Sequence, residues 1–254
     1  MRFMAGIREP ITNNINTRGP GEYTMMRQGG KIMDTGDTII CLHAAASNIE
    51  AVDGVLRDAG FTVEHEVDTM LLAMIRGGEP VERLLNYVAR RLQKLIERKP
   101  SCIFITCTNY IVLLDQIEVS RDVPILKIDE LLFETLAGAE VPIKLLFTNE
   151  QTVAGTMERL MRYVGRPLNV EVVVVPRVFD MYITGDKVGH DAELSRVLAV
   201  LSAECTGDEV LAVAQLSMVG AADVFSEVRG VRVISPLTSF KEKNVRFTTW
   251  KSRM

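Results

Sequence analysis

The chain has 254 residues, of which 47% are hydrophobic and 24% are charged, and these are the proportions of a globular protein. Its net charge of −4 and its isoelectric point near 5.6 argue against a nucleic-acid-binding surface, which is normally basic. No apolar stretch approaches the roughly 20 residues of a membrane-spanning helix, and no secretory signal is visible. We therefore expect a cytoplasmic protein that has neither nucleic-acid nor membrane partners.

The four cysteines are expected to be reduced thiols, because neither an export signal nor a C-x-x-C metal spacing accompanies them. Cys41 and Cys102 fall within apolar strands and Cys205 follows a helix, so all three are predicted to be structural. Only Cys107 stands where an apolar run ends. The three histidines are scattered along the chain and suggest no metal triad, so no bound metal is expected.

Residues 1–36 differ from the rest of the chain. They are rich in Gly, Arg, Asn, Thr and Met and show no sustained period, which is typical of a loose extension. Few acids and several arginines also occur in organellar targeting peptides, but a clear amphipathic helix is missing. We therefore expect the folded region to begin at residue 37.

From residue 37 onward, strand and helix patterns alternate. The first half predicts strands at residues 38–42, 61–67, 102–106 and 124–128. A capping box from Ser47 to Glu50 starts a helix that ends at Gly60, and an amphipathic helix covers residues 81–96. Two more helices follow Cys107 and residue 128. The second half predicts strands at residues 143–147, 170–175, 209–214 and 231–234, with helices between them that include residues 190–201.

This repeated order predicts an internal duplication. His43 and Thr148 lie 105 positions apart, and Cys107 and Gln215 lie 108 positions apart, each at the end of an apolar strand. Strands that alternate with helices imply parallel sheets covered on both faces, and ligands bind beyond the carboxyl ends of such strands. We predict an α/β fold of two similar lobes with a shared cleft. A single sheet with unrelated loop residues is the alternative.

Several common catalytic motifs are absent. No G-x-G-x-x-G follows a strand, and the sequence has no P-loop, no H-E-x-x-H and no G-x-S-x-G. Any chemistry must therefore come from a thiol, hydroxyls, amides and His43.

Six segments at or near the predicted strand ends have a characteristic order and spacing. They are Leu42-His43, Val67-Asp68-Thr69-Met70-Leu71-Leu72, Ile105-Thr106-Cys107-Thr108-Asn109, Pro124-Ile125-Leu126-Lys127-Ile128-Asp129-Glu130, Gly185-Asp186 with His190-Asp191, and Ala214-Gln215-Leu216-Ser217-Met218. Together they resemble the aspartate/glutamate/hydantoin racemase superfamily across most of residues 38–240.

The resemblance implies two α/β lobes with parallel sheets flanked by helices, related by a pseudo-twofold axis, with the site in the cleft between them. The first lobe would comprise residues 37–137 and 235–254, and the second residues 138–234. Racemases of this superfamily use one cysteine from each lobe and need no metal or organic cofactor, and a homo-oligomer is expected. Cys107 matches the first cysteine, but Gln215 stands at the second, and glutamine can only donate and accept hydrogen bonds.

The other predicted site residues are polar groups at strand ends and helix starts. The resemblance places Thr148 and Thr152 where the superfamily binds a carboxylate, and a helix N-terminus favours an anion. The predicted substrate-binding set is His43, Ser47, Thr108, Asn109, Thr148, Thr152 and Ser217. Each residue also has a structural explanation, because such hydroxyls and amides cap helices and His43 could be a buried loop histidine.

We therefore predict a cofactor-independent, racemase-like isomerase that acts on a carbon α to a carboxylate in a small acid, amino acid or hydantoin. Cys107 would be its single acid/base or nucleophile and would need a depressed pKa. Gln215 would stabilise a carboxylate or enolate oxygen instead of transferring a proton. The alternatives are a decarboxylase of the same superfamily and a non-catalytic protein that binds a small carboxylate.

Overall fold

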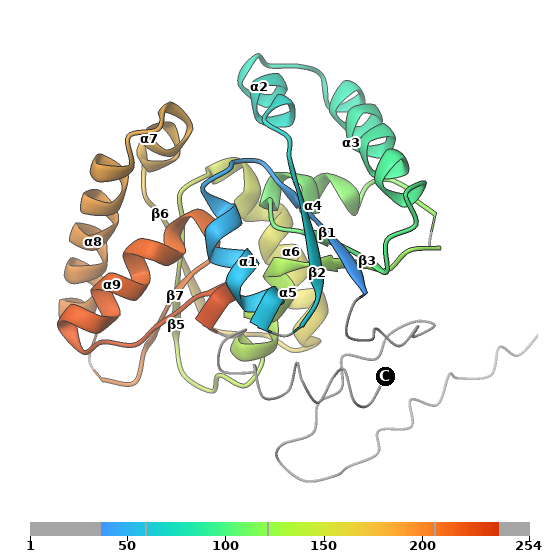
Figure 1. Cartoon of the computed structure of the whole chain (residues 1–254). Coiled ribbons are helices and arrows are strands. Elements are labelled where there is room, and N and C mark those ends of the chain that lie inside the picture. The colour runs from blue at the N-terminus through green and yellow to red at the C-terminus, as the bar shows by residue number, and fades with distance from the viewer. Residues whose placement is uncertain (1–36, 59, 121, 206, 239–254) are drawn as a thin grey trace, which may run out of the picture.

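The computed structural model describes residues 37–58, 60–120, 122–205 and 207–238. They form two four-stranded parallel sheets with the same strand order, β2-β1-β3-β4 and β6-β5-β7-β8 (Figure 1). The first sheet contains β1 (Thr38–His43), β2 (Thr62–Val67), β3 (Cys102–Ile105) and β4 (Ile125–Lys127). The second contains β5 (Ile143–Phe147), β6 (Val170–Val174), β7 (Val210–Val213) and β8 (Val233–Ile234). The predicted α/β fold with two similar lobes is confirmed. Residues 1–36, predicted to be a loose extension, lie outside the described part of the chain.

The helices follow the alternation of the sequence. Between the strands of the first half lie α1 (Asn48–Asp58), α2 (Met70–Arg76), α3 (Val81–Ile96) and α4 (Thr108–Leu114), and α5 (Ile128–Leu136) follows β4. The second half contains α6 (Val153–Val164), α7 (Val178–Thr184), α8 (Lys187–Glu204), α9 (Val219–Arg229) and the short 3-10 turns η1 (Glu150–Thr152) and η2 (Leu216–Met218). The sequence did not predict α2 and α7. Both are only seven residues long, and each is an additional helix in a connection that already contains a long one, so the strand–helix alternation that located the equally short α4 does not reveal them.

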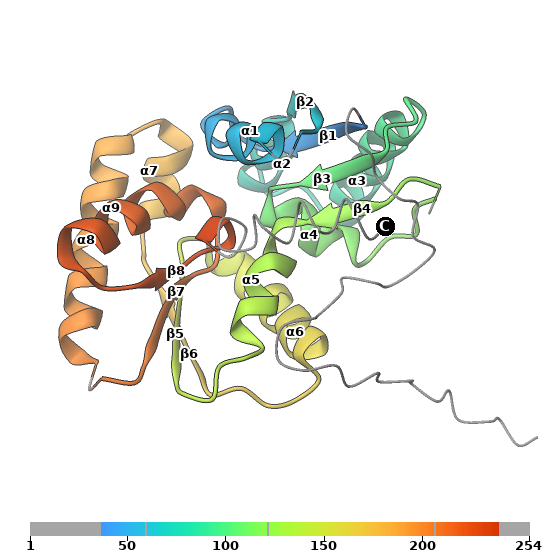
Figure 2. The ribbon, with the colours of Figure 1, turned by 60° about the horizontal axis from the view of Figure 1, so that its bottom comes forward.

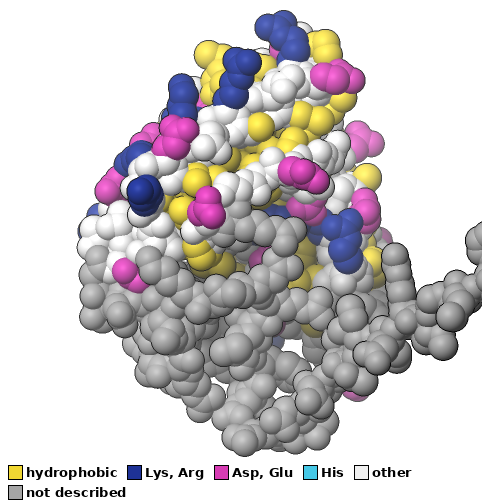
Figure 3. All heavy atoms as spheres, turned by 90° about the vertical axis from the view of Figure 1, so that its right-hand side faces the viewer, with side chains coloured by type: hydrophobic (Ala, Val, Ile, Leu, Met, Phe, Trp, Pro, Cys, Tyr) yellow, Lys and Arg dark blue, Asp and Glu magenta, His cyan; other side chains and the backbone are white. Residues whose placement is uncertain are grey.

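The helix α3 shows how the hydrophobic pattern forms these layers. Its apolar side chains recur every three or four residues, so one face is buried while the other is charged. On the charged face, Arg91 pairs with Glu66 at 2.7 Å, and Arg98 pairs with Glu64 and Glu66. Figure 3 shows this side of the molecule, where acidic side chains are interspersed with basic ones. Arg91 of α3 and Arg98 just after it are therefore paired with acidic side chains of β2.

The helix α5 lies where the two lobes meet and contacts both of them. Ile128 and Leu131 pack with the first-lobe core, whereas Leu132, Phe133 and Leu136 pack with residues of β5 and α6. In Figure 2, α5 and α6 lie between the second sheet and the first lobe. The two lobes are thus joined by shared apolar packing as well as by the chain itself.

The helices α4 and α6 also approach each other closely across this junction. A Cβ added to Gly155 of α6 would lie 2.6 Å from the Cγ1 atom of Val112 on α4, so glycine is needed for this packing distance. Nearby, the guanidinium of Arg159 on α6 binds Asp129 on α5 through two hydrogen bonds of 3.0 and 3.1 Å, and binds Asp115 at 2.6 Å. A buried ion-pair cluster therefore connects the lobes.

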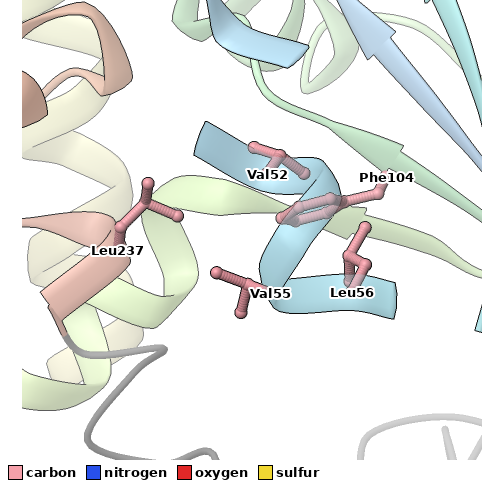
Figure 4. A pocket seen from close by; sticks show the side chains of 5 residues that line it. All are labelled: Val52, Val55, Leu56, Phe104 and Leu237. Atoms are coloured by element: carbon pink, nitrogen blue, oxygen red, sulfur yellow. The ribbon is translucent and has the colours of Figure 1, made fainter. Parts of the chain in front are cut away.

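A small apolar recess lies between α1, β3 and the segment that follows β8. It is lined by Val52, Val55, Leu56, Phe104 and Leu237 (Figure 4). None of these side chains is polar, and none belongs to the predicted site. Leu237, which follows the last strand of the second sheet, therefore packs against the first lobe.

Among the described helices, none combines the length and hydropathy required to cross a bilayer.

Candidate active site

Cys107 and Gln215 occupy equivalent positions in the two lobes. Each lies two residues beyond the end of a central strand, Ile105 for β3 and Val213 for β7. Each has an extended backbone and immediately precedes a helical segment, α4 after Cys107 and η2 after Gln215. Since the two sheets have the same strand order, the structure supports the correspondence predicted from the spacing of these two residues.

The corresponding prediction for His43 and Thr148 is wrong by one residue. Leu42 of β1 and Leu146 of β5 pair with the last residues of β3 and β7, so these leucines are equivalent. The next residues are His43 and Phe147, and Thr148 lies one step further along the chain. Successive side chains of a strand point to opposite faces. A one-residue difference therefore sends His43 into the layer beneath α1.

His43 is completely buried, and other side chains occupy both of its ring nitrogens. The Nδ1 atom lies 2.9 Å from the hydroxyl of Thr106, and the Nε2 atom lies 2.9 Å from Nδ1 of His65. Burial, with the neighbouring His65, lowers the pKa of His43 to about 4. In this arrangement both ring nitrogens of His43 contact other side chains, so His43 is not part of the proposed substrate site.

The thiol of Cys107 is buried, with 7% of the residue exposed. Burial raises its pKa, and the backbone N–H groups of Asn109 and Tyr110 together with the Asn109 side chain oppose this change. The negative charge of Asp68 adds to the increase. We expected a depressed pKa, and the structure corrects this, because desolvation outweighs the helix start. Cys107 is therefore a protonated thiol at neutral pH.

The second lobe holds Gln215 by its side-chain oxygen. The Oε1 atom accepts hydrogen bonds from the backbone N–H of Thr148 at 2.8 Å and from the Thr148 hydroxyl at 2.7 Å. A backbone N–H can only donate, so the oxygen must face Thr148, and the amide NH2 is the end left to act as a donor. No described residue accepts a hydrogen bond from this NH2 group. Thr148 thus orients Gln215.

Two asparagines connect the strand ends across the lobes. The side-chain amide of Asn149 donates to the Oδ1 atom of Asn109 at 3.4 Å, and both residues are buried. Asn109 lies two residues after Cys107, and the backbone N–H of Asn149 lies 3.4 Å from Oε1 of Gln215. The structure therefore brings Cys107, Asn109, Thr148 and Gln215 into one continuous set of contacts.

The other predicted residues take different positions around this set. Thr108 is buried at the start of α4, and Thr152 is buried with its hydroxyl donating to the Asn149 carbonyl at 2.8 Å. Ser217 is half-buried on η2. Ser47 is exposed, and its hydroxyl donates to that of Tyr182 at 3.4 Å. The Thr152 proton is therefore used in a hydrogen bond to the backbone in this state.

The sequence did not single out Tyr182, which α7 of the second lobe contributes. Its hydroxyl donates to Oδ1 of Asn48 at 3.2 Å, at the start of α1. Burial raises the pKa of Tyr182, the hydrogen bond from Ser47 opposes that change, and the proximity of Cys107 adds to it. Tyr182 of the second lobe thus contacts the first lobe at a point close to the Cys107 thiol. Because α7 is too short for a periodic pattern, no local signal marks this residue.

A buried carboxylate lies behind the thiol. Both oxygens of Asp68 accept hydrogen bonds from the Tyr87 hydroxyl, at 2.8 and 2.7 Å, and one also accepts from Tyr110. Arg91 lies 3.6 Å away. Since Tyr110 is on α4, this network fixes the helix that begins directly after Cys107.

The raised pKa of Cys107 can be tested by alkylation. We expect the rate of Cys107 labelling by iodoacetamide to reach half its maximum at a higher pH than that of a free cysteine amide in the same tube. Only the thiolate reacts, and burial delays its formation. Peptide mass spectrometry of samples labelled at a series of pH values separates the four cysteines. A Cys107 midpoint below that of the free thiol would contradict the protonated resting state.

By sequence, the chain matches no protein-family model and no curated protein. By structure, it is similar to the aspartate racemase of Picrophilus torridus, with a TM-score of 0.61 and 12% identity over 85% of this chain and 95% of that one. The glutamate racemase of Bacillus anthracis gives a TM-score of 0.57 and 11% identity over 85% and 81% of the two chains. The allantoin racemase of Klebsiella pneumoniae gives 0.55 and 12% over 84% and 88%.

The chain has the fold of the aspartate/glutamate/hydantoin racemase superfamily. The likeness covers both lobes, and the expected resemblance is confirmed at the level of the fold. Within this racemase fold, Cys107 and Gln215 lie at equivalent strand ends, so the two lobes have different functional groups at equivalent positions.

Proposed function

We propose that the protein is a cofactor-independent isomerase that acts on a carbon α to the carboxylate of a small acid, with Cys107 as its single acid/base. The observation that carries this proposal is the equivalence of Cys107 and Gln215 at the ends of β3 and β7. A thiol can transfer a proton at that position, whereas an amide can only form hydrogen bonds. Proton transfer would therefore occur from one face of the substrate.

The protonation state of Cys107 supports a role as an acid. Because burial raises its pKa, the thiol carries its proton at neutral pH and can deliver it to a carbanion or enolate carbon. The resulting thiolate would be stabilised by the N–H groups of Asn109 and Tyr110, which oppose the effect of burial. In an isomerisation the thiolate form of Cys107 removes the α-proton and the thiol returns it to the enolate, so each cycle ends in the state in which it began. In a decarboxylation the thiolate instead regains its proton from solvent.

The oxygens of the substrate would be held by amide donors. Gln215 offers its NH2 group, since Thr148 holds the other end of the amide. Asn109 lies beside the thiol, and its Oδ1 atom accepts from Asn149 of the second lobe. Hydrogen-bond donors aimed at an enolate oxygen stabilise the charge that develops there. In this arrangement the first lobe would transfer the proton through Cys107, and the second lobe would bind substrate oxygen through Gln215.

A lyase of the decarboxylase type is the second candidate, and the state of Cys107 favours it specifically. Decarboxylation leaves a carbanion without any prior deprotonation, so the enzyme needs only one acid on one face. A protonated thiol paired with a glutamine meets that requirement. Inversion by two opposed thiols would need a second transferable proton, which Gln215 lacks.

The proposal can be tested with the wild-type protein in D2O. A panel of small dicarboxylates, α-substituted malonates, amino acids and hydantoins is incubated with it and followed by proton NMR. We expect deuterium to appear at the α-carbon of at least one compound, either by exchange or on loss of CO2. A compound that binds saturably, while no member of the panel is labelled, would instead favour the small-carboxylate binding protein.

A further inference from the structure

The pairing of β1 with β2 brings three metal-binding side chains together. Cys41 lies opposite His65 in the parallel register, and His43 lies two residues beyond Cys41 on the same face of β1. The thiol sulfur and one nitrogen from each ring lie within 4.8 Å of one another. The two histidines are 22 positions apart in sequence, so only the sheet register creates this cluster.

The outer contacts of the two rings suit metal ligands. The Nε2 atom of His65 lies 2.8 Å from a carboxylate oxygen of Asp53, which can only accept, so this nitrogen carries a proton and Nδ1 of His65 has the lone pair. That lone pair faces Nε2 of His43 at 2.9 Å. Metal-bound histidines characteristically donate their other N–H to a carboxylate, a carbonyl or another oxygen.

The His43 ring can adopt the matching tautomer. Its Nδ1 atom lies 2.9 Å from Oγ1 of Thr106, and that hydroxyl lies 3.1 Å from the carbonyl of Leu42. When the hydroxyl donates to Leu42, Nδ1 of His43 donates to the hydroxyl, and Nε2 is left with its lone pair. Without an ion, a proton between His43 and His65 satisfies both rings. A cation can take the place of that proton, and the proton then moves to Nδ1 of His43, where it is donated to Thr106.

The charges around the cluster come from Asp53 and Arg57 on α1 and from the thiol of Cys41. Asp53 supplies a negative charge, although Arg57 binds the same carboxylate at 2.7 and 2.8 Å. Cys102 is the other titratable group that acts on Cys41, and both thiols are buried. Burial raises the pKa of Cys41, but coordination by a metal ion deprotonates a thiol outright.

We propose that Cys41, His43 and His65 bind a Zn²⁺ ion beneath α1, at a site separate from Cys107. One sulfur and two nitrogen donors are typical of tetrahedral zinc sites, with bonds of about 2.3 Å to sulfur and about 2.0–2.1 Å to nitrogen. At these bond lengths two tetrahedral nitrogen ligands lie about 3.3 Å apart, so the two rings, now 2.9 Å apart at these atoms, would separate slightly around the ion while the Cys41 sulfur stays within reach of it. The Cys41 proton leaves to solvent when the ion binds.

The fourth zinc position would take water from the exposed edge of the sheet. The β2 strand is the edge strand, and the His65 and Asp53 side chains are 14% and 28% exposed there, whereas Cys41 and His43 are fully buried. The ion would tie β1 to β2 and, through Asp53, to α1. It would also hold Thr106, which directly precedes Cys107.

Cobalt is the probe that tests the thiolate directly. The full-length protein is stripped with a chelator and titrated with Co²⁺. We expect saturation at one ion per chain, with a thiolate-to-cobalt charge-transfer band that Zn²⁺ abolishes by displacement. The Cys41→Ser variant should lose this band, and Cys102→Ser should retain it, since Cys102 is an equally buried thiol outside the cluster. No saturable band in the wild type, or a band that survives in Cys41→Ser, would overturn the proposal.

A second variant protects the test against misfolding of Cys41→Ser. Asp53 is partly exposed, and its carboxylate contacts the outer nitrogen of His65 and the exposed Arg57, so Asp53→Asn should fold. We expect it to bind Zn²⁺ at least about 10-fold more weakly, because removing a carboxylate that orients a metal-bound histidine commonly costs that much affinity. Glu50→Gln, an exposed carboxylate change on the same helix, is the control. Competition with a chromophoric chelator measures both affinities, and equal affinities would exclude the proposed His65 geometry.

Discussion

We expect the Cys107→Ala variant to lose α-proton exchange by roughly 10²–10⁴-fold, the usual contribution of one general acid or base. The reason is that Asn109 and Gln215 are amides that cannot transfer a proton, so the Cys107 thiol is the group of this set that can. Tyr182 and Tyr110 lie near the thiol, but burial raises the pKa of both. The measurement is the rate of deuterium incorporation into the best substrate of the panel.

Cys102→Ala is the matched control for this experiment. Cys102 is a buried thiol within β3, only five residues before Cys107, and it lies on the strand instead of beyond its end. Its removal should leave exchange per folded molecule unchanged. Exchange in Cys107→Ala at the wild-type rate, with normal folding by circular dichroism, would eliminate the thiol as the proton carrier. The same result would leave the zinc proposal untouched, since that site uses Cys41.

The Arg159→Met variant should destabilise the protein by about 3–5 kcal/mol at neutral pH, the usual effect of breaking a buried ion pair. Arg159 is 8% exposed and bridges Asp129 and Asp115 between the lobes. Methionine keeps much of the packing volume but leaves the Asp129 carboxylate, which is 1% exposed, without its partner. The free energy of unfolding in urea measures the loss.

The pH dependence separates this charge effect from lost packing. Burial raises the pKa of Asp129, and Arg159 opposes that shift, so removing Arg159 raises the pKa further. Below the raised pKa the carboxyl is protonated and needs no partner. The destabilisation should therefore shrink as the pH falls from 7 toward that pKa. Arg196→Met removes an exposed arginine paired with Glu193 and should leave stability unchanged. A loss that stays constant with pH would contradict the ion-pair explanation.

The sequence predicted the strands and long helices well, because each has a periodic apolar pattern of its own. The amphipathic helix at residues 81–96 has the same bounds in the structure, and the strand at residues 143–147 also agrees. The helices α2 and α7 were missed because a turn or two carries too little periodicity and because each shares its connection with a longer helix, unlike the equally short α4. The consequence for the site is direct, since α7 contributes Tyr182.

The sequence by itself determined the repeated α/β order and the positions of Cys107 and Gln215 just beyond two strands, because these depend on local patterns. Only the tertiary structure decided what those side chains experience. Strand register turned His43 beneath α1 and placed it against His65. Burial between packed elements raised the pKa of Cys107, against our expectation from its place at a helix start. Register and desolvation arise from segments distant in sequence, so no local pattern contains them.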